Sequence, residues 1–147
     1  KQKQGDGMAT ESGVKLQIVG IDHIVIRVKD VEGALAFYTG TLGMEPHRVD
    51  GWRSGELPFP CARINASTLI DLKPWTEDEP VGDGRRNLDH YCLVLDPTDM
   101  DALSDHLRDQ GVTVVSDAPA QRSGARGMAS SIYIQDPEGN QIELRHY

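Results

Sequence analysis

The chain contains an internal repeat, and this repeat limits its possible folds more than any other feature. His23 in the first half corresponds to His90 in the second at an offset of 90 − 23 = 67 residues. Asp71 in TLIDL corresponds in the same way to Glu143 in QIELR, at 143 − 71 = 72. Two polar positions that recur at nearly one period are the trace that an internal duplication leaves. The sequence therefore predicts two copies of one supersecondary unit.

The first copy begins with a strand, because apolar and polar residues alternate along IVGIDHIVIRVKD from Ile18. Asp30 is expected to cap a helix that Gly43 ends in the left-handed conformation. The apolar residues between them are spaced for one helical face: Leu35, Tyr38 and Leu42. Three short strands are predicted to follow, at residues 45–49, 61–65 and 68–73. The first copy is thus β-α-β-β-β.

The second copy repeats this order. LDHYCLVLD predicts a strand, and Thr98 with Asp101 resembles a capping box at the start of a helix. Gly111 is expected to end this helix, whose apolar stripe is Met100, Leu103 and Leu107. Strands are predicted at residues 112–115, 130–135 and 141–146, with the turn DPEGN before the last of them.

Together the two copies predict an α+β fold built from two βαβββ modules. A chain of 147 residues has the usual length of a single domain. We place this domain at residues 17–147, with the first module at about 17–84 and the second at about 85–147. Residues 1–16 are polar and without periodicity, so they are expected to be a flexible segment, in which Met8 is a candidate native start.

Composition excludes several classes of partner. The formal net charge of −8 argues against nucleic acid, which needs clustered lysine and arginine. No apolar run approaches the roughly 20 residues that span a bilayer, and no secretory signal is recognisable, so a cytoplasmic protein with no membrane partner is expected. Cys61 and Cys92 form no Cys-x-x-Cys motif and are expected to be buried thiols.

Strand alternation predicts where the repeated polar residues point. Ile142 and Leu144 are expected to face the core under the helix, so Glu143 must face the opposite side of the sheet. By the same argument, the other repeated polar residues should share one concave surface with Glu143: His23, Asp71 and His90. Two imidazoles with one or two carboxylates suit Zn, Ni, Co, Mn or Fe and leave coordination positions for substrate oxygens. Against this, a single histidine in a strand is more often a hydrogen-bonded structural residue.

Three segments resemble the vicinal-oxygen-chelate superfamily, the glyoxalase, bleomycin-resistance and extradiol-dioxygenase group. They are DHIVIRVKDVEGALAFYTGTLGM, NLDHYCLVL and SSIYIQDPEGNQIEL. The resemblance covers about Ile18 to Tyr147 and implies that two modules form an open, eight-stranded cup around one divalent metal ion. Its implied ligands are His23, His90 and Glu143, with Asp71 where glyoxalase I usually has glutamate. Some members of the family keep the cup without the ion and only bind small molecules.

Arginines are the candidates for substrate binding. Arg27 lies on the strand face of His23, and glyoxalase I has an arginine at a similar position that meets a substrate carboxylate. Arg27 could instead pair with Glu143 or Asp71. Arg122 and Arg126 lie in QRSGARGM, which is expected to be a loop that either closes over the cup or is simply solvated.

The resemblance leads to three hypotheses about function. The first is a metal-dependent, glyoxalase I-like lyase or isomerase, in which Glu143 or Asp71 moves a proton next to a carbonyl of a small-molecule substrate. The second is an Fe(II) dioxygenase, which needs two histidines and one carboxylate. The third is an antibiotic-resistance or small-molecule-binding protein of the fosfomycin or bleomycin type. A homodimer is expected in each case.

Overall fold

The computed structural model describes residues 14, 16–76, 87–135, 137 and 139–147. The chain forms two compact units. We call residues Asp22–Tyr91 the N-terminal unit, and the residues up to Ile21 together with Cys92–Tyr147 the C-terminal unit. These units differ from the modules expected from the repeat, because the strands that open the two modules each contribute residues to both units.

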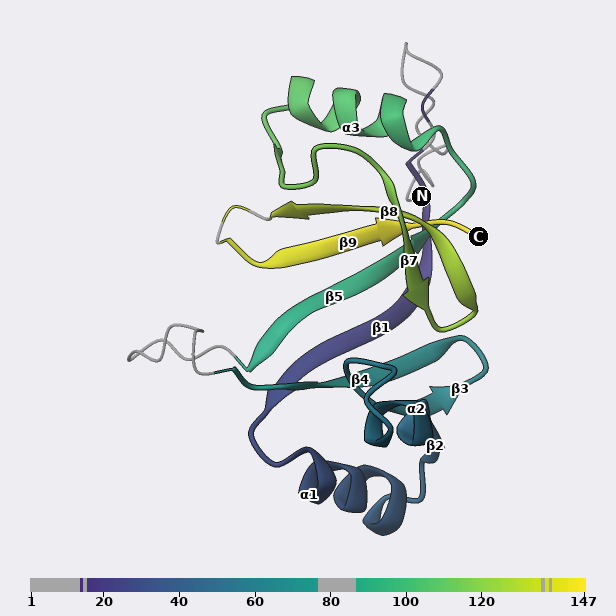
Figure 1. Cartoon of the computed structure of the whole chain (residues 1–147). Coiled ribbons are helices and arrows are strands. Elements are labelled where there is room, and N and C mark those ends of the chain that lie inside the picture. Colours follow the sequence, from purple (N-terminus) through teal and green to yellow (C-terminus); the bar gives the residue numbers. More distant parts are fainter. Residues whose placement is uncertain (1–13, 15, 77–86, 136, 138) are drawn as a thin grey trace, which may run out of the picture. The chain divides into compact units, whose positions relative to one another are not determined.

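The N-terminal unit contains a sheet with the strand order β2-β3-β4-β1-β5. Its elements in chain order are β1 (Ile18–Val28), α1 (Val31–Leu35), the π-helix η1 (Ala36–Thr41), β2 (Glu45–His47), α2 (Val49–Arg53), β3 (Cys61–Asn65), β4 (Thr68–Pro74) and β5 (Leu88–Leu95). Strands β1 and β4 are parallel, whereas β4 pairs antiparallel with β3 and β3 with β2. Figure 1 shows β4 beside β1 and the helix α2 next to β2.

The predicted helix begins and ends at the expected residues, but its winding changes between them. At its start, the Asp30 carboxylate accepts a hydrogen bond of 2.9 Å from the Gly33 amide. At its end, Gly43 has a positive φ of 71°, the left-handed conformation that ends the helix. Between them the α-helix widens into a π-helix, which adds a residue to the turn and shifts the apolar face. Leu42 is consequently 55% exposed, whereas Leu35 is buried against Val31 and Leu72 as predicted.

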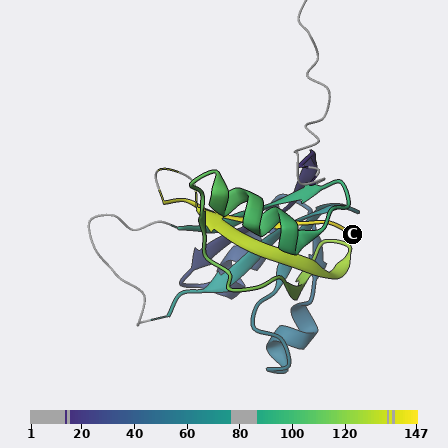
Figure 2. The same cartoon turned by 90° about the horizontal axis from the view of Figure 1, so that it is seen from above.

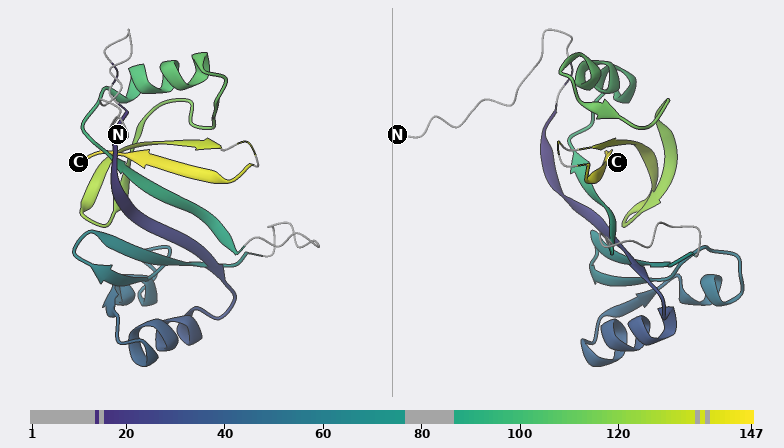
Figure 3. Two further views of the ribbon diagram at one scale, coloured as in Figure 1. Left: turned by 180° about the vertical axis from the view of Figure 1, so that it is seen from behind. Right: turned by 90° about the vertical axis from the view of Figure 1, so that its left-hand side faces the viewer.

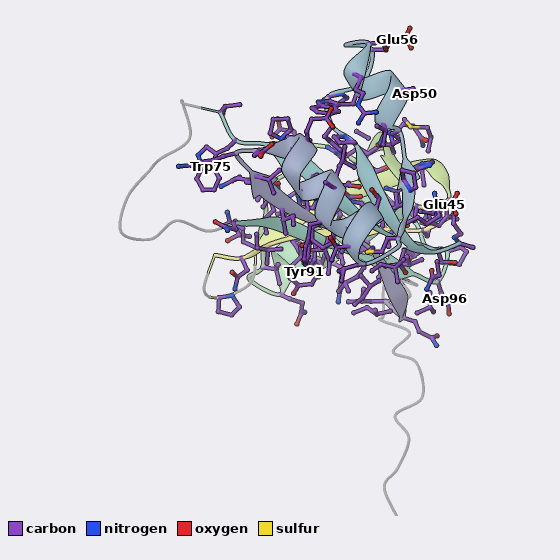
Figure 4. All side chains as sticks on the ribbon, turned by 90° about the horizontal axis from the view of Figure 1, so that it is seen from below. Glu45, Asp50, Glu56, Trp75, Tyr91 and Asp96 are labelled. Carbon is purple, nitrogen blue, oxygen red and sulfur yellow. The ribbon has the colours of Figure 1, made fainter. Side chains whose placement is uncertain are left out.

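The helix α2 was not predicted. It follows Arg48, the one described non-glycine residue with a positive φ, and it shortens the expected strand of residues 45–49 to β2. Asp50 on α2 and Glu56 just after it lie at the edge of the unit (Figure 4).

The C-terminal unit contains the second half of β5 and a helix packed on antiparallel strands. Its further elements are α3 (Met100–Asp109), β6 (Thr113–Val114), β7 (Ala120–Gly124), β8 (Gly127–Gln135) and β9 (Gln141–Arg145). The strand order is β5-β9-β8-β6, and β7 pairs with β8. Seen from above, α3 crosses β8 (Figure 2), and the core beneath it contains Met100, Leu103, Leu107, Ile132 and Leu144.

Two local predictions in this unit need correction. The residue that caps α3 is Asp99, whose carboxylate accepts from the Ala102 amide at 3.0 Å, and not Thr98. The segment QRSGARGM is not a loop over the site but part of a hairpin, with Arg122 on β7 and Arg126 in the turn before β8. Figure 3 shows that β7 and β8 curve together. The hairpin escaped prediction because β7 has the sequence AQRSG, which lacks alternating apolar residues.

The described elements confirm an α+β fold. The predicted β-α-β-β-β order is present in both halves, with α2 added in the first half and β7 added in the second. The described residues form nine strands rather than the eight expected, because β7 lies in a segment that was predicted to be a loop. No helix among the described residues has the length and apolar character needed to cross a membrane.

Candidate metal centre

The N-terminal unit brings the two repeated histidines together. His23 lies on β1 and His90 on β5, and both side chains are buried, with exposed fractions of 3% and 8%. Their ring centroids are 5.6 Å apart and the ring planes are nearly perpendicular. One ring nitrogen of each histidine lies within 4.8 Å of the other. Two strands far apart in sequence therefore present both imidazoles to one small volume.

Each histidine is held by the aspartate that precedes it. His23 Nδ1 is 2.7 Å from Asp22 Oδ1, and His90 Nδ1 is 2.6 Å from Asp89 Oδ2. An ionised carboxylate only accepts hydrogen bonds, so each Nδ1 carries the hydrogen. The Nε2 of a neutral ring then offers its lone pair, which is the orientation that carboxylate partners impose on metal-binding histidines.

Asp71 joins this pair from β4. Its Oδ2 is 4.0 Å from His23 Nε2, and its Oδ1 is buried without a hydrogen-bond partner among the described residues. Burial raises the pKa of the Asp71 carboxyl above its usual value, against the lowering effects of His23 and of a hydrogen bond from the Cys61 thiol. Cys61 and Asp71 are directly paired residues of β3 and β4.

These residues fit a divalent cation. Two oriented imidazoles offer neutral nitrogen donors, and a buried carboxylate oxygen that lacks a hydrogen bond is costly unless a cation or water satisfies it. This donor set suits the borderline metals Zn, Ni, Co, Mn and Fe.

Glu143 lies in the C-terminal unit, on β9, and is 1% exposed. Its Oε2 accepts from Arg145 Nη1 at 3.0 Å and from the Cys92 thiol at 3.2 Å. Burial, followed by the charge of Glu143 and a hydrogen bond to it, raises the pKa of Tyr133. Glu143 is therefore a fixed carboxylate with one oxygen already engaged by a guanidinium.

Arg145 is completely buried and ties Glu143 to the β7–β8 hairpin. Besides Glu143, its guanidinium donates to the carbonyl oxygens of Ser123, Arg122 and Gly127 at 2.9–3.0 Å. A Cβ atom on Gly124 would come within 2.5 Å of the Arg145 guanidinium carbon. The hairpin can therefore approach Arg145 only because this position is glycine.

Arg27 pairs with Asp89, a carboxylate that was not considered from sequence. Its Nη2 and Nε lie 2.8 and 3.0 Å from Asp89 Oδ1, and Lys73 Nζ lies 3.1 Å from the same oxygen. The hydrogen bond to His90, together with the hydrogen bond and charge of Lys73, keeps the pKa of Asp89 well below its usual value, against the raising effect of burial.

The arginines of the hairpin contact aromatic rings of their own unit. Arg122 donates to Ser131 O at 2.7 Å and lies over the Tyr133 ring at 4.7 Å. Arg126 lies over the Tyr147 ring at 4.1 Å.

Sequence reasoning missed three partners of the predicted ligands. Asp22 and Asp89 precede the two histidines at the same offset of 67 residues, so the repeated Asp-His pair was a usable signal. Arg145 follows Glu143 by two residues and hence shares its strand face. The cysteines are buried as expected, but each also donates to a predicted carboxylate ligand.

The chain belongs to the Glyoxalase/Bleomycin resistance protein/Dioxygenase superfamily, whose family model matches residues 20–144. It is 30% identical to the virulence protein STM3117 of Salmonella typhimurium, over 91% of this chain and 88% of that protein. It is also 30% identical to a probable lactoylglutathione lyase of Synechocystis, over 83% of this chain and 91% of that protein.

Among solved structures, the fold is similar to the Mn(II)-bound glyoxalase from Novosphingobium aromaticivorans. The TM-score is 0.65 at 22% identity, and the match covers 89% of this chain and 40% of that one. This likeness supports the fold, and the Mn(II) ion is a property of that protein.

Proposed function

We propose that this protein is a metal-dependent enzyme of the glyoxalase I type, which moves a proton next to a carbonyl group of a small-molecule substrate. The ligands of its single divalent metal ion are His23, His90 and Glu143, with Asp71 as the fourth. The observation that carries the proposal is the pair of Asp-His hydrogen bonds, which leaves the Nε2 atoms of two neighbouring imidazoles to bind the metal, with Asp71 Oδ2 4.0 Å from His23 Nε2.

The metal, when bound, polarises adjacent substrate oxygens and stabilises the negative charge that develops on them. The protein side chains supply orientation and proton transfer. Asp22 and Asp89 hold the two imidazoles, and burial of the surrounding side chains keeps bulk water away from the reacting carbon.

Asp71 is the better candidate for the base. Its raised pKa makes the ionised carboxylate a stronger proton acceptor, and Oδ1 has no competing hydrogen bond among the described residues. Glu143 has a guanidinium and a thiol on one oxygen, which stabilises its ionised form and weakens it as a base. Asp71 therefore accepts the proton from the substrate carbon and returns it to the neighbouring carbon.

Substrate binding is assigned to Arg27 and Arg126, which face an anionic group of the substrate. Arg27 is 26% exposed at its side chain, so it can contact a ligand while Asp89 fixes its position. Arg126 is exposed on the turn between β7 and β8.

Two measurements test this function. Elemental analysis of protein purified without chelators should find about one divalent metal per chain. Adducts of a thiol and a 2-oxoaldehyde that carry deuterium on the carbon next to the carbonyl should then turn over more slowly than the protium adducts, because breaking of that C–H bond is part of the proposed reaction. Stoichiometric iron with oxygen consumption would instead indicate the dioxygenase. Protein that neither contains nor takes up metal would indicate the binding protein.

A further inference from the structure

The two repeated Asp-His pairs have different surroundings. Asp22, which holds His23, is completely buried. Asp89, which holds His90, keeps 11% of its side chain exposed and contacts two cations whose side chains are 26% and 37% exposed. The pair at Asp89 is therefore accessible from solvent through two partly exposed cations, whereas Asp22 is shielded from solvent.

The contacts of Asp89 divide cleanly between its two oxygens. Oδ1 accepts from Arg27 and from Lys73, whereas Oδ2 accepts from His90 Nδ1. The backbone fixes this arrangement, because Arg27 and Lys73 are paired residues of the parallel strands β1 and β4. The Arg27 amide also donates to Asn87 O at 2.7 Å, which brings the start of β5 alongside.

We propose that Asp89 is a positioning residue that couples an anion-binding pair, Arg27 and Lys73, to His90. An anion held by the pair draws both cations away from Oδ1, so that more of the carboxylate's negative charge acts on the His90 Nδ1–H. His90 Nε2 then becomes a better electron donor to the metal. His23 is held by Asp22, which is completely buried, so a dissolved anion does not reach that pair.

This inference rests on the proposed function, because it assumes that His90 Nε2 binds the metal. Coupling between two binding sites is reciprocal, so an anion that raises metal affinity must itself bind more tightly when the metal is present. The enzyme would thereby favour its anionic substrate in the metal-loaded state.

The first experiment uses metal-free full-length protein, so that it is independent of metal binding. Ring-nitrogen NMR shifts of His23 and His90 are followed while sulfate is added at constant ionic strength, at about pH 8, where unperturbed histidine is neutral. The expected result is a saturable shift of His90 with His23 unchanged, and loss of the response in Lys73→Gln. Equal movement of both histidines, or of neither, would overturn the coupling.

The second experiment measures zinc affinity by competition with a chelator, with and without sulfate. Sulfate should tighten zinc binding several-fold in the wild type and not in Lys73→Gln. Asp89→Asn should weaken zinc binding about 10–100-fold and abolish the sulfate effect. Asp22→Asn is the matched control, because it should weaken zinc binding while the sulfate effect remains.

The two experiments distinguish failure of the coupling from failure of the proposed function. If the wild type binds no zinc but sulfate still moves the His90 resonance alone, the proposed function fails and the coupling stands. If zinc binds but Asp89→Asn and Asp22→Asn respond to sulfate in the same way, the coupling fails and the proposed function stands.

Discussion

Asp71 and Glu143 occupy equivalent positions in the repeat but differ in their partners. A thiol donates to each of them, from Cys61 and Cys92 respectively. Only Glu143 also has a buried guanidinium at 3.0 Å. Equivalent carboxylates in different electrostatic surroundings are suited to different roles, and this difference underlies the proposed division between base and metal ligand.

Substitution of these two carboxylates tests that division. Asp71→Asn should lower turnover at saturating metal by about 100-fold or more, because an amide cannot accept the proton. Glu143→Gln should chiefly weaken metal binding and retain more turnover once metal is saturating. Steady-state kinetics together with metal titration separates the two effects. If the larger loss of turnover belongs to Glu143→Gln, Glu143 is the base and the assignment must be reversed.

At the scale of elements, the start of α3 gives a sharp comparison of two adjacent residues. Asp99 makes the capping hydrogen bond, whereas Thr98 lies one residue before the cap. Asp99→Ala should lower the free energy of unfolding by about 1 kcal/mol, and Thr98→Ala should change it by less than about half as much. Urea denaturation of both variants provides the measurement. Equal losses would mean that the hydroxyl shares the capping role.

The close approach of the β7–β8 hairpin to Arg145 gives a second prediction at this scale. Gly124→Ala places a methyl group against the Arg145 guanidinium, which cannot retreat without losing its carbonyl acceptors. The substitution should cost about 1–3 kcal/mol of stability, as overpacking does. Thermal unfolding followed by circular dichroism measures the loss. Gly40→Ala is the control, because no atom lies within 4 Å of a Cβ built there, and it should be far milder.

These elements also show what the sequence could predict. α3 was predictable because its stripe of Met100, Leu103 and Leu107 has helical spacing and all three residues are buried. Its cap was misplaced by one residue because Thr98 and Asp99 are both good capping residues. The curved β7 and the short α2 have no periodic apolar residues. β7 forms through its pairing with β8, and α2 follows the unusual backbone conformation of Arg48, and both depend on tertiary structure.

The candidate site, too, could be predicted only in part from the sequence. Strand alternation correctly placed Asp71 opposite Ile70 and Leu72, since these two residues belong to the core cluster near α1. Alternation also gave the face of Arg27, but not its partner. Asp89 is 62 residues away in sequence, and only the pairing of β1 with the start of β5 brings the two side chains together.

At the scale of the whole molecule, a homodimer remains a prediction. Ile18, Val19 and Ile21 lie consecutively around Gly20 on β1 and are each 50–56% exposed. Exposed apolar residues on a strand are commonly covered by another chain, and two-fold pairing is the usual arrangement. Light scattering at micromolar concentration should give twice the chain mass of 16.2 kDa. Val19→Lys should shift the protein toward monomer, and a wild-type monomer would contradict the prediction.

Metal binding should also stabilise the whole fold, because the proposed ligands are distributed over 143 − 23 = 120 residues of chain. An unfolded chain cannot assemble such a site, so metal binds the native state and shifts unfolding by mass action. At a free metal concentration of about 100 Kd the gain is about 2.7 kcal/mol, or roughly 10 °C in Tm for a chain of this size. Differential scanning calorimetry with and without zinc measures it.

Histidine variants distinguish this site from adventitious metal binding. His90→Ala removes a proposed ligand and should abolish most of the metal-dependent rise in Tm while leaving a folded metal-free protein. His106→Ala is the matched control, because His106 lies in the last turn of α3 and belongs to no proposed ligand set. It should keep the full rise. Equal shifts in both variants would show that zinc stabilises the protein from elsewhere, and the assignment of His90 as a ligand would then have to be abandoned.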